Sequence, residues 1–389
     1  MKRATTTKLI LLLVMGVVGV CEGRIITVNG DGPADFSTIQ GAIDDANDGD
    51  TVVVADGRYT GQGNRDIDFL GKAITVRSEN GPERCIVDCN GSEGEPHRGF
   101  IFQSGEDPNS VVAGFTITNA YVRIRGGAIT LDFSSSPTIT GCVIKGNTAQ
   151  AGICTIEGHG GSVCSPIIRN CVIVDNIGGG VFVVGSGFLG SICDRYRAYA
   201  EIINSTIANN AGDGITAQRN CMVTIRNCIV RGNTNTDVKM GICEDCCDPK
   251  AEISYSNVDP NGVSDPGALY VDWGQGNVDV APCFADPNGG DYHLESQAGR
   301  WDANEGRWAI DEVTSPCIDS GNPISPIGHE PFPNGGIINT GAYGGTAQAS
   351  KSYLGDPLCE TVVAGDINGD CKVNLTDFAL MAFHWLEEN

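Results

Sequence analysis

A run of oxygen-bearing side chains near the end of the chain has the spacing of a calcium-binding loop. Residues 366–377 carry carboxylate or amide oxygens at positions 1, 3, 5, 9 and 12, and the carbonyl of position 7 is also available. This spacing wraps the chain around one Ca²⁺ ion, with the last carboxylate in the first turn of the helix that follows. The predicted ligands are Asp366, Asn368, Asp370, Lys372 through its carbonyl, Asn374 and Asp377.

This loop differs from an EF-hand in having Cys371 where glycine is usual and Asp377 where glutamate is usual. The closing aspartate resembles a type I dockerin repeat, which implies a cohesin-like protein partner. A complete dockerin has two such loops, and one is visible between residues 351 and 389. Two interpretations stay open: a display module, or a Ca²⁺-stabilised terminal clip cross-linked by Cys359 and Cys371.

One short phrase recurs through the middle of the chain and indicates the elements that position other residues. It combines β-branched residues with a following Asn, and its copies align on one apolar residue each. The aligned residues are Ile117, Ile144, Ile173, Ile207 and Val230, at steps of 27, 29, 34 and 23 residues. A strand and a turn that repeat at this interval predict a solenoid in which each copy forms one coil.

Side-chain alternation in these strands predicts what each position does. Phe115, Cys142, Cys171, Ser205 and Cys228 stand two residues before the aligned positions, so both sets share one face and stack in the interior. Asn147, Asn176, Asn210 and Asn233 stand three residues after them, where each strand ends. Asparagine tolerates left-handed backbone and can bond to its equivalent one coil away, so we expect an asparagine ladder.

The phrase resembles the coils of right-handed parallel β-helix proteins of the pectin-lyase-like superfamily. The opening residues 25–59 support the resemblance, because Ile39, Ala42, Ile43 and Ala46 have the spacing of a short amphipathic helix that would cover the first coil. Ser37 or Asp35 is the expected N-cap. The resemblance implies an all-β solenoid over residues 24–290, a closing module over 291–350 that covers the last coil, and the dockerin-like tail.

The superfamily contains lyases, hydrolases, esterases and non-catalytic binders, so its catalytic motifs must be sought one by one. The Leu-Gly-Arg-Pro-Trp signature of pectin methylesterases is absent. The polygalacturonase motifs occur only as Gly158-His159-Gly160 and Asn235-Thr236-Asp237, in reversed order and without the paired aspartates. Neither chemistry is therefore predicted.

A pectate-lyase-like elimination requires fewer specific residues than these reactions, since one Lys or Arg on an outer strand face can remove the proton next to a uronate carboxylate. The outward positions supply three candidates for this base, Lys145, Arg226 and Arg231. The expected function is β-elimination of an acidic extracellular polysaccharide with the help of Ca²⁺. The alternative is a non-catalytic β-helix that binds polysaccharide or serves as a surface scaffold.

The first 23 residues predict export. Lys2, Arg3 and Lys8 precede the apolar run 9–20, and Cys21 and Gly23 are small residues before a cleavage site. The run is shorter than the roughly 20 residues that cross a bilayer. Cys21 also leaves a lipoprotein signal open, although Val20 is bulkier than such signals prefer.

Export changes how the 17 cysteines are interpreted, because an oxidising compartment lets them pair. The local pairs Cys85/Cys89, Cys154/Cys164, Cys193/Cys221, Cys283/Cys317 and Cys359/Cys371 are plausible. The CxxCC spacing of Cys243, Cys246 and Cys247 could suggest Zn²⁺, but with no His nearby and no second CxxC it favours a disulfide-braced loop. A net charge of −23 excludes a nucleic-acid binder, since phosphate affinity comes from Lys and Arg.

Overall fold

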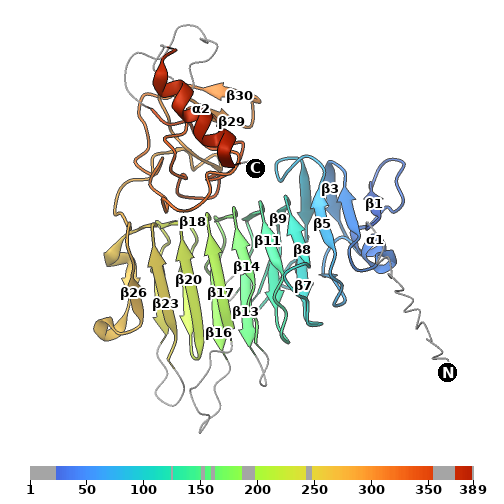
Figure 1. The fold of residues 1–389 in the computed structure, drawn as a ribbon. Helices are drawn as coiled ribbons and strands as arrows, with labels where there is room; N and C mark the ends of the chain where they lie inside the picture. Colours follow the sequence, from blue (N-terminus) through green and yellow to red (C-terminus); the bar gives the residue numbers. More distant parts are fainter. Residues whose placement is uncertain are drawn as a thin grey trace, which may run out of the picture.

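The computed structural model describes residues 23–123, 126–149, 154–158, 163–185, 198–241, 248–353 and 373–387. In these residues the chain winds through three parallel sheets, and each circuit adds one strand to each sheet (Figure 1). The predicted all-β parallel solenoid is therefore confirmed for the coils. The sheets are named sheet 1, sheet 2 and sheet 3 in the order in which the chain meets them.

Sheet 1 is the longest and has ten strands. Its strands, in spatial order, are β1 (Ile25–Val28), β2 (Thr51–Val54), β5 (Thr75–Ser78), β8 (Val111–Ala113), β11 (Thr138–Thr140), β14 (Ile167–Arg169), β17 (Ala198–Ile203), β20 (Cys221–Arg226), β23 (Lys250–Ser254) and β26 (Val271–Trp273).

Sheets 2 and 3 have eight strands each. Sheet 2 contains β3 (Gly57–Thr60), β6 (Cys85–Asp88), β9 (Thr116–Thr118), β12 (Val143–Lys145), β15 (Val172–Val174), β18 (Thr206–Ala208), β21 (Ile229–Arg231) and β24 (Asn257–Val258). Sheet 3 contains β4 (Ile67–Asp68), β7 (Phe100–Phe102), β10 (Ile129–Leu131), β13 (Cys154–Gly158), β16 (Val181–Gly185), β19 (Ile215–Gln218), β22 (Val238–Gly241) and β25 (Val263–Ser264).

The register of sheet 2 confirms the repeat alignment residue by residue. Ile117 pairs with Ile144, Ile144 with Ile173, Ile173 with Ile207, and Ile207 with Val230. The same row continues to Val87 and Val258, which the sequence phrase does not mark. All of these side chains are buried in one continuous core, so the register follows from keeping the apolar row inside.

The asparagine ladder is also confirmed. The Oδ1 of Asn176 accepts from both the backbone N and the Nδ2 of Asn147, each at 3.0 Å, and Asn210 and Asn233 repeat this pattern one coil further on. Each of these amides also donates to a strand carbonyl, such as that of Ile117. The ladder ends on the buried Asp237, whose Oδ1 accepts from Nδ2 of Asn233 at 3.0 Å.

A second interior row runs through the predicted cysteine positions. Cys142, Cys171 and Cys228 are buried, and each thiol lies 3.2–3.4 Å from the carbonyl oxygen two residues earlier. The Oγ of Ser205 donates to the equivalent carbonyl at 2.9 Å. The backbone N of Cys171 donates to Ser205 Oγ at 3.2 Å. Burial raises the pKa of Cys228 to about 12, so its thiol is protonated and packs as a small apolar group.

Three of the expected disulfides are wrong for this structure. Cys85, Cys89, Cys221, Cys283 and Cys317 are free thiols. Cys85 and Cys89 are both buried but four residues apart along an extended chain, about 13 Å, which a disulfide cannot span. The Sγ of Cys317 accepts instead from Asn257 Nδ2 at 3.0 Å. Cys193, Cys359, Cys371 and the cluster at 243–247 lie outside the described residues, as does the side chain of Cys154.

Helix α1 (Ile39–Asp45) forms where the apolar spacing predicts it and lies at the N-terminal end of the solenoid (Figure 1). Ile39, Ala42 and Ile43 are buried against the first coils. The N-cap is Thr38, whose side chain accepts from Gly41 N at 3.3 Å, and not Ser37 or Asp35. Asp35 is engaged elsewhere, because its carboxylate accepts from the backbone N and the hydroxyl of Thr27.

The chain after the last coils turns back along the side of the solenoid. Two 3₁₀ turns, η1 (Pro260–Gly262) and η2 (Pro266–Ala268), precede β26. Residues 281–353, called here the flanking segment, contain two antiparallel pairs, β27 (Phe284–Asp286) with β28 (Asp291–Leu294) and β29 (Arg300–Asp302) with β30 (Arg307–Ala309). Figure 1 shows β29 and β30 beside the coils.

The flanking segment therefore covers the outer face of sheet 2 over several coils, whereas the sequence predicts a module that covers the last coil. Its contacts reach from Asn170, just after β14, to Asn257 on β24. Tyr292 is buried and receives a hydrogen bond from Asn209 Nδ2 at 2.9 Å, so its side chain packs against the coils. Trp301 and Trp308 pair edge to face across the β29–β30 hairpin.

Helix α2 (Leu375–Glu387) follows the predicted calcium loop. Asn374 accepts from Thr376 N through its side chain at 2.8 Å, and Asp377 accepts from Asn374 N at 2.7 Å. This reciprocal pattern resembles a capping box. The signal segment 1–22 and loop residues 366–372 lie outside the described residues. No helix in the described ranges is both long and apolar enough to span a bilayer.

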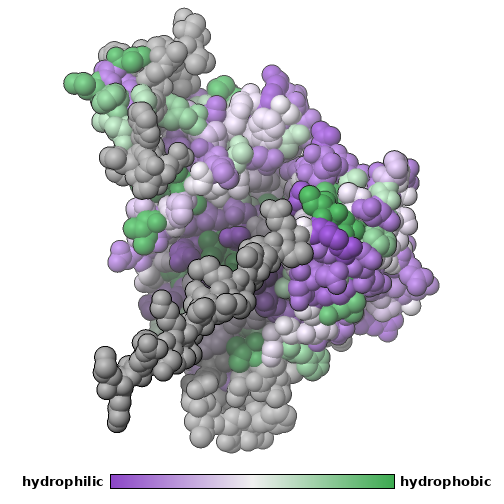
Figure 2. Space-filling model, turned by 45° about the vertical axis from the view of Figure 1, so that its right-hand side comes forward, coloured by the Kyte–Doolittle hydropathy of each residue, from purple (hydrophilic) through white to green (hydrophobic). Residues whose placement is uncertain are grey.

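The surface contrasts with this apolar interior. Figure 2 shows a mainly hydrophilic surface over the N-terminal coils, with small hydrophobic areas. This partition is what a solenoid requires when every coil buries one face of its strands and leaves the other in water.

Replacing Asn210 by Ala is expected to lower the free energy of unfolding by about 2–3 kcal/mol, because the buried N and Nδ2 of Asn176 lose their acceptor. Chemical denaturation measures this loss. Asn235→Ala is the matched control, since Asn235 is exposed and its side chain has no hydrogen bond within the described part of the chain. Equal stability of the two variants would contradict a structural role for the ladder.

Candidate functional site

A cleft of about 240 Å³ opens between the outer face of sheet 2 and the flanking segment. It combines the cation of Lys145 with several acidic and polar groups. The coils contribute Pro82, Glu83, Ile86, Thr116, Val143 and Lys145, and the flanking segment contributes Gly289, Gly290, Asp291, His293, Ala303, Asn304 and Tyr343.

Lys145 is the basic residue of this cleft. It is the last residue of β12, where the buried Ile144 points inward, so alternation turns Lys145 outward. It pairs in register with Val174 on the next coil. No ion pair or side-chain hydrogen bond joins Lys145 to another residue of the described ranges, and its amine is therefore available to a ligand.

The cleft stops at β15 because the flanking segment closes over the next coils. Val174 and Ala208 are predicted to face outward, yet they are almost fully buried. They form a small apolar cluster with Val172, Tyr292 and Ala342 on the outside of sheet 2. Lys145 thus lies at the border between the covered and the open part of the sheet.

Asp291 organises the opposite wall. Its Oδ1 lies 2.6 Å from His293 Nδ1, and its Oδ2 accepts from Arg300 Nη1 at 3.0 Å. Arg300 is also paired with Asp311 at 3.2 Å. Burial acts to raise the pKa of Asp291, but the hydrogen bonds of His293 and the charge of Arg300 outweigh it and lower the pKa below its usual value.

His293 is held by packing as well as by Asp291. Its ring stacks on Tyr343 with ring centroids 3.6 Å apart. The side chain is 2% exposed, and its Nε2 is buried without a hydrogen-bond partner. Because the Nε2 is enclosed, His293 positions the wall of the cleft and does not present a base to it.

A second cavity, of about 270 Å³, adjoins the cleft. The two share Pro82, Glu83, Val143 and Tyr343. The second cavity continues over Gly114, Gly141 and Asn170, which are equivalent residues of successive coils with positive φ. Tyr343 thus stands between two open spaces along the same side of the solenoid.

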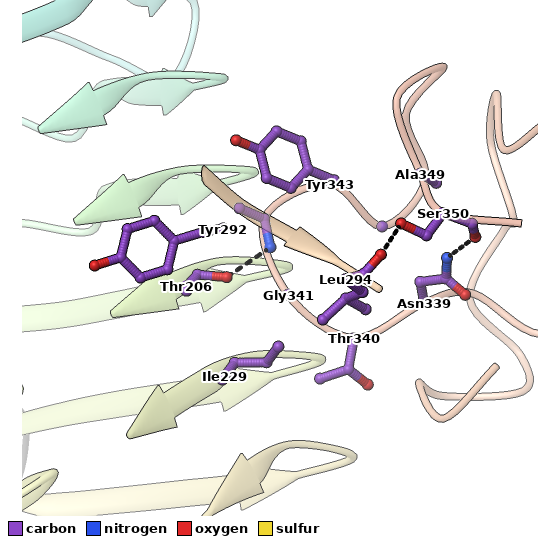
Figure 3. Close-up of a pocket in the computed structure, with 12 residues that line it drawn as sticks. Thr206, Ile229, Tyr292, Leu294, Asn339, Thr340, Gly341, Tyr343, Ala349 and Ser350 are labelled. Carbon is purple, nitrogen blue, oxygen red and sulfur yellow. Dashed lines mark hydrogen bonds between the residues drawn. The ribbon is translucent and has the colours of Figure 1, made fainter. Parts of the chain in front are cut away.

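The contact that holds the flanking segment in place is polar and specific (Figure 3). Thr206 Oγ1 accepts from Ala342 N at 3.1 Å, Ser350 Oγ donates to Leu294 O, and Asn339 Nδ2 donates to Ser350 O at 2.7 Å. The space among these residues is only about 10 Å³. It holds at most one water molecule, so it is a packing gap and not a binding site.

A row of asparagines on neighbouring coils binds the backbone of the segment. Asn170 Nδ2 donates to Ala342 O and Gly344 O at 2.9 and 2.8 Å, and Asn204 Nδ2 donates to Asn339 O at 3.2 Å. Asn227 Oδ1 accepts from Asn322 N at 2.8 Å. On the two preceding coils the equivalent residues are glycines, and there the second cavity stays open.

Glu330 fixes the loop that carries Tyr343. Its Oε1 accepts from the backbone N of both Asn339 and Gly345 at 2.8 Å. Its Oε2 is buried and has no hydrogen-bond partner. Burial, reinforced by the nearby charge of Asp319, raises the pKa of Glu330 to about 7 in spite of the two backbone donors.

The structure does not bring the three predicted bases together. Arg231, three strands from Lys145 in sheet 2, forms an ion pair with Asp279 at 2.7 Å and donates to Asn257 Oδ1 at 3.1 Å. Arg226 lies at the end of β20 in sheet 1, on a different face. Arg231 is therefore a structural residue, and Lys145 alone belongs to the cleft.

A wider depression of about 420 Å³ lies near the start of sheet 1. Its titratable lining residue, Asp50, is bound to Arg24 through both the backbone N and the guanidinium. The N–H of Asn47 and the contacts of Arg24 lower the pKa of Asp50 despite its burial. This carboxylate has a structural role, so the depression offers no free reactive group.

The predicted calcium loop is only partly described. Asn374 and Asp377 lie at the start of α2, with Asp377 in its first turn as expected, while Asp366, Asn368, Asp370 and Lys372 lie outside the described residues. Among the residues described, no group of three or more His, Cys, Asp or Glu side chains could hold a metal. Calcium at 366–377 stays a prediction.

Sequence reasoning identified Lys145 but missed Glu83, Asp291, His293 and Arg300. Glu83 lies on a neighbouring coil, whereas Asp291, His293 and Arg300 approach Lys145 only because the flanking segment folds back over more than a hundred residues. The segment lacks the repeat phrase, and its contacts with the coils are set by backbone hydrogen bonds. Asp237, part of the Asn-Thr-Asp tripeptide, is explained instead as the end of the asparagine ladder.

Comparisons with known proteins agree with the coil architecture. Residues 36–189 match the family described as right handed beta helix region, and residues 167–321 match the family described as disaggregatase related. The crystal structure of pectate lyase Pel9A is 15% identical, covers 83% of this chain and 97% of its own, and superposes with a TM-score of 0.39. No curated protein matches the sequence. The family match over residues 36–189 identifies the parallel coils there as a right-handed β-helix.

The carboxyl of Glu330 is expected to make stability depend on pH. Its folded pKa of about 7 lies above the ordinary 4.5, so its contribution to stability is complete below pH 4.5 and is lost as the pH rises through 7. The loss is at most roughly 3 kcal/mol. Thermal unfolding of Glu330→Gln should show a smaller change between pH 4.5 and 7 than the parent.

The exposed Glu312→Gln variant serves as the control for this comparison. It should follow the parent at every pH. An unchanged pH dependence in Glu330→Gln would show that Glu330 does not titrate in this range.

Proposed function

We propose that this protein acts on an acidic polysaccharide, and that the cleft at Lys145 carries out a pectate-lyase-like β-elimination. The observation that carries this proposal is the unpaired amine of Lys145 on an outward strand position inside a cleft. A chain of net charge −23 has many carboxylates that could have neutralised it. The match to a β-helix family supports the fold of the coils, and the proposed reaction rests on the residues of the cleft.

In this mechanism the neutral amine of Lys145 removes the proton on the carbon next to the uronate carboxylate. The electron pair of that C–H bond forms a carbon–carbon double bond, and the glycosidic C–O bond breaks. The leaving oxygen keeps its electron pair and takes a proton from water or from the Lys145 ammonium. A base positioned in this way typically contributes about 10²–10⁴ in rate.

The acidic groups around Lys145 favour a calcium-assisted form of this reaction. Glu83 and Asp291 line the same cleft, and a polyuronate would be repelled by them without a cation. Ca²⁺, if bound between the exposed Glu83 and the substrate, would neutralise the uronate carboxylate and stabilise the charge that develops next to it. Asn304 adds a neutral polar group that can orient a sugar hydroxyl.

Lys145→Met is expected to reduce the release of unsaturated uronides by about 100-fold or more, because the variant keeps the bulk but lacks the base. Ultraviolet absorbance measures the product with Ca²⁺ over pectate, alginate and related polymers. Lys250→Met is the matched control, since Lys250 is an exposed lysine on β23 away from the cleft. Equal activity in the two variants would remove Lys145 from the mechanism.

The second candidate is a non-catalytic polysaccharide-binding β-helix. The enclosed Nε2 of His293 favours it, because the histidine of the cleft then cannot act as a second base beside Lys145. Affinity gels with the same polymers distinguish the two. Retardation of the parent protein without any unsaturated product would support binding and rule out the lyase.

We further propose that the protein is exported through residues 1–23 and displayed or stabilised through the dockerin-like tail. Asp377 in the first turn of α2 supports the calcium loop. Phe378 and Met381 on the same helix are exposed and offer an apolar surface to a cohesin-like partner. The same helix could instead serve a calcium-stabilised terminal clip.

Isothermal titration of Ca²⁺ into the full chain is expected to show one site from this loop. Asp377→Asn should abolish that heat, because the amide can still accept from Asn374 N but lacks the charge that Ca²⁺ requires. Asp272→Asn, an exposed residue on β26, is the control. The same heat in both variants would contradict the calcium loop.

A further inference from the structure

The outer face of sheet 1 presents its side chains in rows that run along the solenoid. Register places Arg77, Ala113, Thr140, Arg169, Ile203, Arg226 and Ser254 in one row at the last outward position of successive strands. Figure 1 shows the strands of this sheet side by side, with the flanking segment placed at their upper ends and not over the sheet. The row therefore lies on an open face.

The three arginines of this row have no carboxylate partner in the described structure. Arg77 and Arg169 are exposed, and Arg77 donates only to the carbonyl of the adjacent Ser78 at 3.1 Å. Arg226 is half-buried, and its Nε is enclosed without a hydrogen-bond partner. In contrast, Arg58, Arg84 and Arg123 each form an ion pair.

The unpaired state of these arginines is not caused by a lack of acids nearby. Glu201 and Glu252 occupy the adjacent outward row on β17 and β23. Neither forms an ion pair with Arg169 or Arg226. Further toward the N-terminal end, the adjacent row is neutral, with Thr75, Val111, Thr138 and Ile167.

We propose that this arginine row binds a linear acidic polysaccharide laid along the axis of the solenoid. Arg77 and Arg169 are three strands apart and Arg169 and Arg226 two, which corresponds to about 14 and 10 Å. A polyuronate carries one carboxylate on every sugar, so it can place an acid at each arginine. Between Arg77 and Arg169 the row contains only the small side chains of Ala113 and Thr140, which leave room for a polymer to lie close to the sheet.

This face lies on sheet 1 and is separate from the cleft, which lies on sheet 2. The inference rests on the proposed function, because it assigns the same class of acidic polymer to this face. A guanidinium binds a carboxylate through two parallel N–H donors. Each exposed pair contributes little by itself, but one polymer engages the three arginines together, and the effective concentration of the later contacts is high. The row would hold the polymer while the cleft acts on it.

The test is affinity electrophoresis of the full chain in gels that contain polygalacturonate, with EDTA present so that no Ca²⁺ can bridge acids. The variant Arg77→Gln/Arg169→Gln/Arg226→Gln should bind on the order of tenfold more weakly than the parent. Arg58→Gln/Arg84→Gln/Arg123→Gln is the control, because it removes the same charge from arginines that are already paired. Thermal unfolding verifies that both variants are folded.

Two further measurements separate this proposal from the catalytic one. Binding should weaken as salt is raised and should be absent with fully methyl-esterified polygalacturonate. Lys145→Met should be retarded like the parent even if it has lost all activity. The proposal is overturned if the parent is not retarded in EDTA, if the control triple variant loses as much affinity, or if the esterified polymer binds equally well.

Discussion

The hydrogen bonding of each coil to the next is the constraint on which the rest of this structure depends. A solenoid has no central core that closes on itself, so each turn must satisfy its buried polar groups with the turn one coil away. Asn176, Asn210 and Asn233 each accept two hydrogen bonds from the asparagine of the previous coil, and Asn147 at the start of the ladder accepts one from Ala120 N. A one-residue slip would break this ladder and expose the apolar row beside it.

Because the register is fixed, side chains on the outside of the coils also form rows. These rows are the surfaces that can bind other segments of the chain or a ligand. Asn170, Asn204 and Asn227 bind the backbone of the flanking segment. The segment then covers the middle of sheet 2 and leaves a cleft where Lys145 lies at the border. The arginine row on sheet 1 follows from the same geometry. A cleft and a flat binding face thus arise from one repeat.

Charge distribution gives the two faces different character. Asp291 is paired with Arg300, and Arg231 is paired with Asp279. Lys145 and the arginines of sheet 1 are left without such partners, although acids outnumber bases in the chain by 48 to 25. On a protein with a net negative charge, anions therefore bind preferentially at the few positions where a cation has no acidic partner.

The repeat phrase by itself determined the solenoid, the residues that face inward and the asparagine ladder, because period-2 alternation recurs in every coil. The separate apolar spacing of Ile39, Ala42 and Ile43 determined the position of the first helix. The repeat phrase also placed Lys145 on an outer face. Only the tertiary structure decided that Arg231 is paired and that residues 281–353 lie over sheet 2. Those outcomes depend on which distant segments meet. Asp291 reaches the cleft of Glu83 and Lys145 because asparagine side chains of the coils bind the backbone of the flanking segment. Such hydrogen bonds leave no periodic pattern in the sequence.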